Sequence, residues 1–172
     1  MTKEWSYLAS EVFQQRCVLA ANWLKECRTI LDVGGYKTPI NRFLTHDSRA
    51  SVTVIDPRIK NSSLGPHRYI NGLWQDHKID QTEGIVILGI EIHAPESEWQ
   101  YFINFIDSCQ KGVIGVAEDH IHSVNMWAKI QQSLKKIRVQ MQIGLDLRDN
   151  DFGDLTNSGP PYTKRKLYFL GR

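Results

Sequence analysis

Seven short apolar segments, most of them separated by segments with helical spacing, constrain the fold of this 172-residue chain most strongly. The clearest is "IVILGIEI" at 85–92, because a nearly continuous apolar run is typical of a strand buried on both faces of a parallel sheet. By contrast, "VQMQIGLDL" at 139–147 is apolar at every second position, which predicts a strand near a sheet edge. The predicted strands are 29–33, 51–55, 68–70, 85–92, 113–117, 139–147 and 167–170.

The intervening segments carry apolar residues at the three-to-four-residue spacing of helices. One long helix or two joined helices are expected at 3–27, and further helices at 95–109 and 123–136. Another helix is expected after Pro39, since the missing N–H of proline costs nothing in a first helical turn. This helix would bury Ile40, Phe43 and Leu44.

Strands that alternate with helices predict a mainly parallel sheet with right-handed crossovers. The last two predicted strands have only the turn-rich segment 149–161 between them, which can join an antiparallel pair. The sequence therefore predicts a doubly wound α/β fold. Its sheet would have seven mainly parallel strands, helices on both faces and an antiparallel last strand.

The length fits one domain, 1–172, with a helical segment at 1–27 and an α/β core at 28–172. A net charge of +2 without a dense basic patch makes nucleic-acid binding an unfavoured function, and the basic runs at 135–138 and 164–166 are expected to be solvated. Three cysteines without a CxxC pair favour reduced thiols, and no membrane-spanning or signal segment is visible, so a cytoplasmic location is expected. The sequence does not decide whether the chain forms a homodimer or binds a protein partner.

Polar residues follow four of the predicted strands in an otherwise apolar sheet. Ligands of open α/β sheets bind beyond the carboxyl ends of the strands, where the strand order reverses. These strand ends are therefore the expected site. They carry Asp32, Gly34 and Gly35 at the end of the first strand, Asp56 after the second, Glu91 and His93 at the end of the fourth, and Glu118, Asp119, His120 and His122 after the fifth.

The glycine turn after the first strand does not match the signatures of phosphate-binding loops. A dinucleotide site needs GxGxxG, but counting from Gly34 the second and third glycine positions hold Tyr36 and Pro39. The missing glycines disfavour a nicotinamide-dependent oxidoreductase, and a P-loop is absent as well. Asp56 would accept hydrogen bonds from both hydroxyls of a ribose, or it is simply a turn aspartate before Pro57.

The segments "ILDVGG", "VTVID" and "GIVILGIEIH" resemble the successive strand motifs of the class I S-adenosylmethionine-dependent methyltransferases. The resemblance extends over 28–172 and includes the reversed final strand. It implies that Asp32, Gly34 and Gly35 hold the methionine part of S-adenosylmethionine and that Asp56 holds its ribose. Tyr36, which follows Gly35, and Pro57, which follows Asp56, complete the candidate cofactor site.

The loop departs from the family pattern of an acidic residue followed by three alternating glycines, because only Gly34 is in place and Tyr36 occupies the second glycine position. One hypothesis is that Gly35 takes the positive φ one position earlier and reshapes the loop. The other is that Tyr36 fills the pocket and the domain binds nothing.

"AEDHIH" at 117–122 suggests chemistry at the fifth strand end. In an extended segment His120 and His122 project to one side together with Glu118, and His93 comes from the adjacent strand end. Three interpretations of these residues stay open. They supply a general base, they bind a metal ion, or they are polar strand ends in which His122 or Ser123 caps the next helix.

Two functions from different classes follow. The first is a small methyltransferase that binds S-adenosylmethionine and acts on a small-molecule acceptor, with Glu91, His93, Glu118 and His120 facing the acceptor and no metal. The second is a non-catalytic binding or scaffold protein with the same fold, to which the five tryptophans would contribute an interface or core packing.

Overall fold

The computed structural model describes residues 11–89, 95–146 and 164–172. Residues 3–10 of the predicted first helix, Glu91, His93 and the segment 149–161 lie outside these ranges. In the part of the chain that is described, no helix combines the length and apolar character that crossing a bilayer requires.

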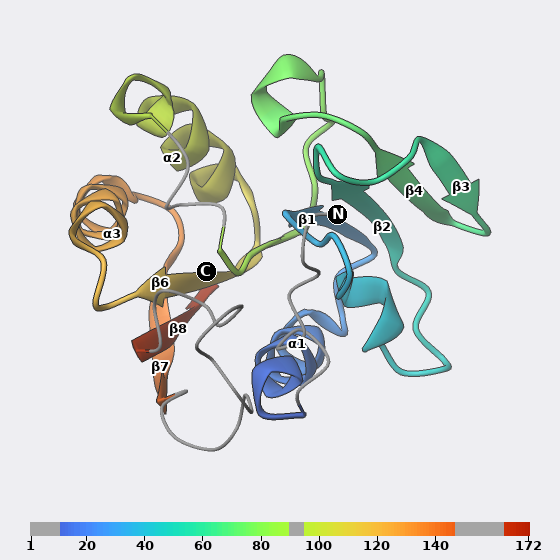
Figure 1. The fold of residues 1–172 in the computed structure, drawn as a ribbon, viewed down its shortest axis with the longest axis horizontal. Helices are drawn as coiled ribbons and strands as arrows, with labels where there is room; N and C mark the ends of the chain where they lie inside the picture. Colours follow the sequence, from blue (N-terminus) through green and yellow to red (C-terminus); the bar gives the residue numbers. More distant parts are fainter. Residues whose placement is uncertain (1–10, 90–94, 147–163) are drawn as a thin grey trace, which may run out of the picture.

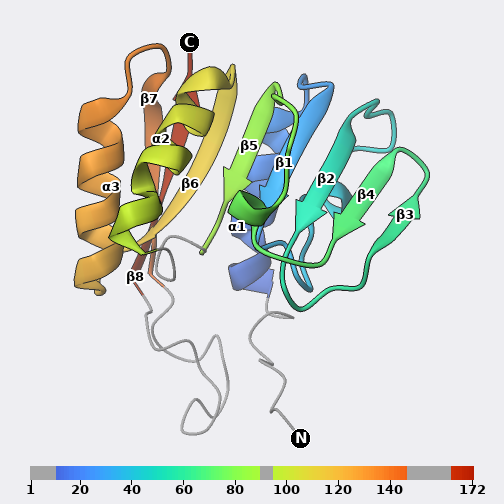
Figure 2. The same cartoon turned by 90° about the horizontal axis from the view of Figure 1, so that it is seen from above.

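Within the described ranges, all strands belong to one eight-stranded sheet, seen across its width in Figure 2. The strand order is β3-β4-β2-β1-β5-β6-β8-β7, with the five strands from β4 to β6 parallel, and β3 and β8 antiparallel to their neighbours. The strands are β1 (Thr29–Val33), β2 (Ser51–Ile55), β3 (Ser62–Leu64), β4 (His67–Ile70), β5 (Gly84–Ile87), β6 (Lys111–Ala117), β7 (Arg138–Asp146) and β8 (Lys164–Gly171).

The predicted fold class is confirmed, including the reversed last strand, but the described part of the chain contributes eight strands to the sheet and not seven. The additional strand is β3, which forms a hairpin with β4. Its sequence, "SSL", is fully exposed, so no burial pattern marks it in the sequence.

Helices cover both faces of the sheet. Figure 1 shows α1 (Glu11–Leu24) on one face and α2 (Trp99–Ser108) and α3 (Ile121–Ser133) on the other. A core lies between the sheet and each helical layer. The α1-face core includes Leu24, Ile30, Val54, Val86 and Phe169, and the α2/α3-face core includes Leu31, Ile85, Phe102, Ile106 and Ile130.

The prediction of a helix after Pro39 is wrong, because the segment forms only a 3₁₀ turn at Ile40–Arg42. The Ile40 N–H donates to Asp32 Oδ2 at 2.7 Å, and the Phe43 N–H closes the turn on the Ile40 carbonyl at 3.0 Å. The polar residues 45–49 then lead directly into β2. The turn therefore serves to bring a backbone N–H onto Asp32.

Strand β7 is at the sheet edge as predicted, but its alternation is broken by a bulge between Val139 and Met141. Val139 is opposite Leu170 and packs with the α2/α3-face core, whereas Ile143 is opposite Leu167 and packs with the α1-face core. The bulge thus moves the apolar residues of one strand from one face to the other.

Candidate functional site

The carboxyl ends of β1, β2 and β5 meet at the centre of the sheet, where the chain order reverses. From β1 the chain builds β2 and β4 on one side and then crosses to β5 on the other. Val33 is paired with Ile55 on one side and with Ile87 on the other, so the loops after the three strands are neighbours. This is the position at which open α/β sheets bind ligands.

Each glycine of the loop after β1 is required for a different reason. Gly34 has φ 82° and donates its N–H to the Ile55 carbonyl at 2.9 Å, so the left-handed conformation falls on Gly34. The hypothesis that Gly35 takes this conformation is therefore wrong. Gly35 is needed for space, because a Cβ there would lie 2.6 Å from Asp32 Cγ.

Asp32 points back under this loop and is buried, with 4% of its surface exposed. Burial raises the pKa of the Asp32 carboxyl to about 7, although the Ile40 N–H and the positive charge of Arg16 act to lower it. Asp32 therefore takes up and releases a proton close to neutral pH.

Two arginines that the sequence interpretation did not select flank the end of β5. Arg16 of α1 donates from Nη1 to the Leu88 carbonyl at 2.9 Å. Arg165 of β8 is only 7% exposed, and its Nη1 is 3.8 Å from a Cβ placed on Gly89. The expectation that all of 164–166 is solvated is thus wrong for Arg165, whose inward direction follows from its position two residues before the buried Leu167.

Asp56 follows β2 and is 1% exposed. Its Oδ1 accepts hydrogen bonds from the backbone N–H of Arg58 at 2.8 Å and from Arg58 Nε at 2.9 Å, and its Oδ2 accepts one from Arg58 Nη2 at 2.7 Å. The aspartate therefore does form a turn, and it binds the guanidinium of the same turn through both oxygens.

Tyr36 is brought to the same place from the loop after β1. The Arg58 guanidinium carbon lies 4.5 Å from the centre of the Tyr36 ring, within the range of a cation–π contact. The sequence predicted Tyr36 and Asp56 as neighbours at the site, but not that Arg58 connects them.

A cavity of about 220 Å³ opens between the ends of β1 and β2, the segment after β4 and the start of α2, and it is lined by Ile55 and Pro57, the chain neighbours of Asp56. Its Trp74 is 2% exposed and stacks on Phe102 with ring centres 4.7 Å apart, and Trp74 Nε1 has no hydrogen-bond partner among the described residues. A polar rim is formed by Gln75, which donates to Glu98 at 2.7 Å. The lining residues are Val33, Ile55, Pro57, Gly72, Leu73, Trp74, Gln75, Pro95, Glu98 and Phe102.

Most of this lining was missed from the sequence. Only Pro57 was selected, and Trp74 was interpreted as a core or interface residue. The segment that holds Trp74 is a 3₁₀ turn at Trp74–Asp76, which has no repeat from which its inner side could be recognised.

At the end of β6, the predicted acceptor residues are engaged within the protein. Glu118 forms an ion pair with Lys166 at 2.7 Å. His120 Nδ1 accepts the Ser123 N–H at 3.2 Å, so His120, and not His122 or Ser123, caps α3. The His122 ring packs against Trp99 at 5.3 Å. Across the three described ranges, no three histidine, cysteine or acidic side chains are grouped to hold a metal.

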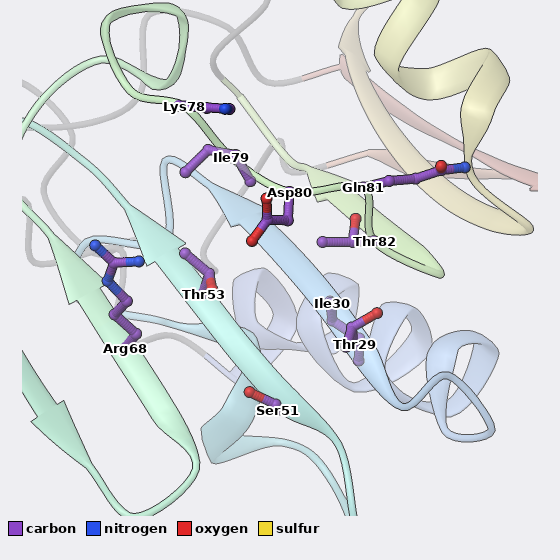
Figure 3. A pocket seen from close by; sticks show the side chains of 10 residues that line it. All are labelled: Thr29, Ile30, Ser51, Thr53, Arg68, Lys78, Ile79, Asp80, Gln81 and Thr82. Atoms are coloured by element: carbon purple, nitrogen blue, oxygen red, sulfur yellow. The ribbon is translucent and has the colours of Figure 1, made fainter.

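A second cavity, of about 170 Å³, lies over the amino-terminal half of β1, β2 and β4 (Figure 3). Arg68 and Thr53 come from the sheet, and Lys78 and Asp80 come from the segment before β5. Since Thr29 and Ser51 begin their strands, this cavity is distant from the carboxyl ends and is not part of the candidate site.

No protein-family model matches the sequence, and no curated protein does either. Solved structures do match. The 1,6-didemethyltoxoflavin-N1-methyltransferase of Burkholderia thailandensis, solved with S-adenosylhomocysteine, is 8% identical with a TM-score of 0.65, over 95% of this chain and 79% of that chain. An O-methyltransferase of Bacillus cereus, also in complex with SAH, is 10% identical with a TM-score of 0.60, over 95% and 82%.

Human N-acetylserotonin methyltransferase in complex with SAM is 13% identical with a TM-score of 0.54, over 92% of this chain and 52% of that chain. These proteins are named for different methylation reactions but share one architecture. The chain therefore has the Rossmann-like fold of the class I methyltransferases, and a fold by itself does not establish an activity.

Proposed function

We propose that this protein is a small methyltransferase that binds S-adenosylmethionine and acts on a small-molecule acceptor. The observation that carries the proposal is the cavity at the carboxyl ends of β1 and β2, which is lined by both chain neighbours of Asp56 and lies on the side of β1 opposite β5. The structural neighbours solved with SAH or SAM support the choice of cofactor.

The residues around the cavity fit an adenosine. Asp56 would accept hydrogen bonds from the two ribose hydroxyls, while Pro57 and Phe102 offer apolar walls to the adenine ring. Trp74 Nε1 is a buried donor without a described partner, and such groups are costly unless a ligand or water accepts the hydrogen bond. Gln75 adds a polar group at the rim.

The methionine end would lie along the loop after β1. Gly34 and Gly35 keep this loop close to the sheet, and Asp32 lies directly beneath it. Arg16, at the Leu88 carbonyl, would face the carboxylate of this end. Tyr36 forms the outer wall and contacts Arg58.

Bound S-adenosylmethionine would supply a methyl group on a sulfonium, which is already an activated leaving group. The chain would then mainly align the acceptor and accept its proton. Glu118 and His120 lie at the neighbouring strand end and, with Glu91 and His93, are the proposed acceptor-side residues. His120 would first have to release the Ser123 N–H to offer Nδ1 as a base.

One observation favours the non-catalytic alternative: the guanidinium of Arg58 already occupies both oxygens of Asp56. A scaffold protein could retain this pair permanently. The two functions differ in whether the cofactor binds.

Calorimetric titration with S-adenosylhomocysteine separates them. We expect micromolar binding that is lost in Asp56→Ala and weakened several-fold in Trp74→Phe, which keeps an aromatic ring but lacks the donor. Asp80→Ala, an aspartate at the other cavity, should bind as the wild type does. A folded wild-type protein that binds no S-adenosylhomocysteine would refute the proposal and favour the scaffold.

A further inference from the structure

Arg58 separates Asp56 from solvent. The side chain of Arg58 is 46% exposed, whereas that of Asp56 is 1% exposed, and the two are joined at 2.7 Å. Since the guanidinium binds both carboxylate oxygens, a ligand that approaches Asp56 from solvent meets Arg58 first.

Tyr36 supports the guanidinium from the other loop. The ring belongs to the loop after β1, and Arg58 belongs to the loop after β2, so their contact at 4.5 Å connects the two loops that frame the site. We refer to Tyr36, Asp56 and Arg58 as the Tyr36–Arg58–Asp56 cluster.

The hydrogen-bonding capacity of Asp56 makes the two-pronged guanidinium pairing and a ribose exclusive alternatives. An ionised carboxylate offers about four lone-pair positions, and Arg58 uses three of them. Two ribose hydroxyls need two positions. The backbone N–H of Arg58 can stay, because its bond is local to the turn, so the guanidinium must give up at least one of its two bonds and with it the grip on both oxygens.

We propose that Arg58 determines cofactor affinity by exchange: its guanidinium occupies Asp56 when no cofactor is bound and leaves when the ribose hydroxyls arrive. This inference rests on the proposed function and adds a residue that acts through Asp56. The measured affinity is then the intrinsic affinity multiplied by the fraction of molecules in which Arg58 has left Asp56.

The first test is the affinity for S-adenosylhomocysteine in Arg58 variants. Arg58→Ala should bind about tenfold more tightly than the wild type, because the competing charge pair and ring contact are removed. Arg58→Lys, which keeps the charge but not the two-pronged geometry, should lie between them. Lys60→Ala removes an exposed positive charge two residues further on and should leave the affinity unchanged.

Ionic strength provides a readout that a purely structural role would not move. Added salt weakens the partly exposed ion pair, so it should tighten wild-type binding and have no such effect on Arg58→Ala. Binding that becomes weaker in Arg58→Ala would overturn the exchange, since Arg58 would then contact the cofactor. Unchanged binding would overturn it as well.

A second test needs no cofactor. Thermal midpoints of Tyr36→Ala, Arg58→Ala and the double variant form a cycle in which the cluster predicts a double loss smaller than the sum of the single losses. An additive cycle would overturn the cluster itself. If neither the wild type nor Arg58→Ala binds S-adenosylhomocysteine, the proposed function fails with the exchange. If the wild type binds S-adenosylhomocysteine, Arg58→Ala binds it no more tightly and the cycle is non-additive, the exchange is overturned but the proposed function is not.

Discussion

Asp32 has its carboxyl group inside the protein, between the glycine loop and the 3₁₀ turn that follows it. Burial is the main reason that its pKa rises to about 7, and the nearby Asp56 carboxylate raises it further. The Arg16 charge and the Ile40 N–H are not sufficient to offset the loss of water.

This environment predicts an unusual pH dependence of stability. An unfolded aspartate has a pKa of about 3.9, so the folded protein binds this proton more tightly than the unfolded chain does. The resulting stabilisation is complete below about pH 4 and is lost as the pH rises through about 7, by roughly 4 kcal/mol. Thermal midpoints of Asp32→Asn should therefore exceed those of the wild type at about pH 8 and approach them at about pH 5.

Asp80→Asn, which alters an exposed aspartate, is the matched control and should follow the wild type at both pH values. A wild type and an Asp32→Asn variant whose midpoints change in parallel would contradict the raised pKa.

Individual site residues were predictable where chain position alone decides their place. Asp32 is the next-to-last residue of a predicted strand, and Gly34 and Asp56 directly follow predicted strands, so they had to lie at the carboxyl edge. Arg58 and Trp74 lie in irregular segments whose side-chain directions depend on tertiary contacts. No periodicity in the sequence indicates those directions.

Among the elements, the end of α2 is fastened to the turn between α3 and β7 by one side chain. Asp107 Oδ1 accepts the N–H groups of Lys136 at 2.7 Å, Lys135 at 2.8 Å and Ile137 at 3.3 Å. Partial burial acts to raise the pKa of this carboxyl, but the three backbone donors and the Lys136 charge lower it below its usual range. Asp107 thus sets where β7 begins.

Asp107→Ala should lower the free energy of unfolding by about 1–3 kcal/mol, since three backbone donors lose one shared acceptor. Asp107→Asn keeps an acceptor oxygen and should lose less. The advantage of the wild type is present above about pH 4 and should disappear as the pH falls through the lowered pKa. Urea denaturation near pH 7 and near pH 3 measures both effects, and equal midpoints for wild type and Asp107→Ala at pH 7 would refute them.

The elements themselves were predicted unevenly for the same reason. The strands and helices with strong apolar periodicity were predicted correctly. The short third strand predicted at 68–70 is also present, as β4. The 3₁₀ turn at Ile40–Arg42, the exposed β3 and the bulge in β7 were not, because β3 has no buried residue and the turn and the bulge are set by hydrogen bonds that no apolar spacing indicates.

For the whole molecule, the two cores share the same strands. Ile30 packs in the α1-face core, and the next residue, Leu31, packs in the α2/α3-face core. Since both side chains belong to one strand, unfolding of that strand removes residues from both cores. The predicted single domain is expected to unfold as one cooperative unit.

Substitutions on opposite faces test this cooperativity. Leu24→Ala and Ile106→Ala, both at fully buried positions, should each lower the stability by about 2–5 kcal/mol. Each should also keep one transition, at the same denaturant concentration by circular dichroism and by tryptophan fluorescence. Ile121→Ala, where the side chain is 74% exposed, should change the stability by less than about 0.5 kcal/mol. Two separate transitions in either core variant would show that the faces unfold independently.

The two outer strands of the sheet have a consequence for the behaviour of the protein at high concentration. An exposed strand edge invites pairing with a second chain unless it is short, charged or distorted. Here β3 has three residues, and β7 begins with Arg138 and is interrupted by its bulge. Both borders are therefore poor templates for extending the sheet, so the parallel strands between them are protected from edge-to-edge aggregation.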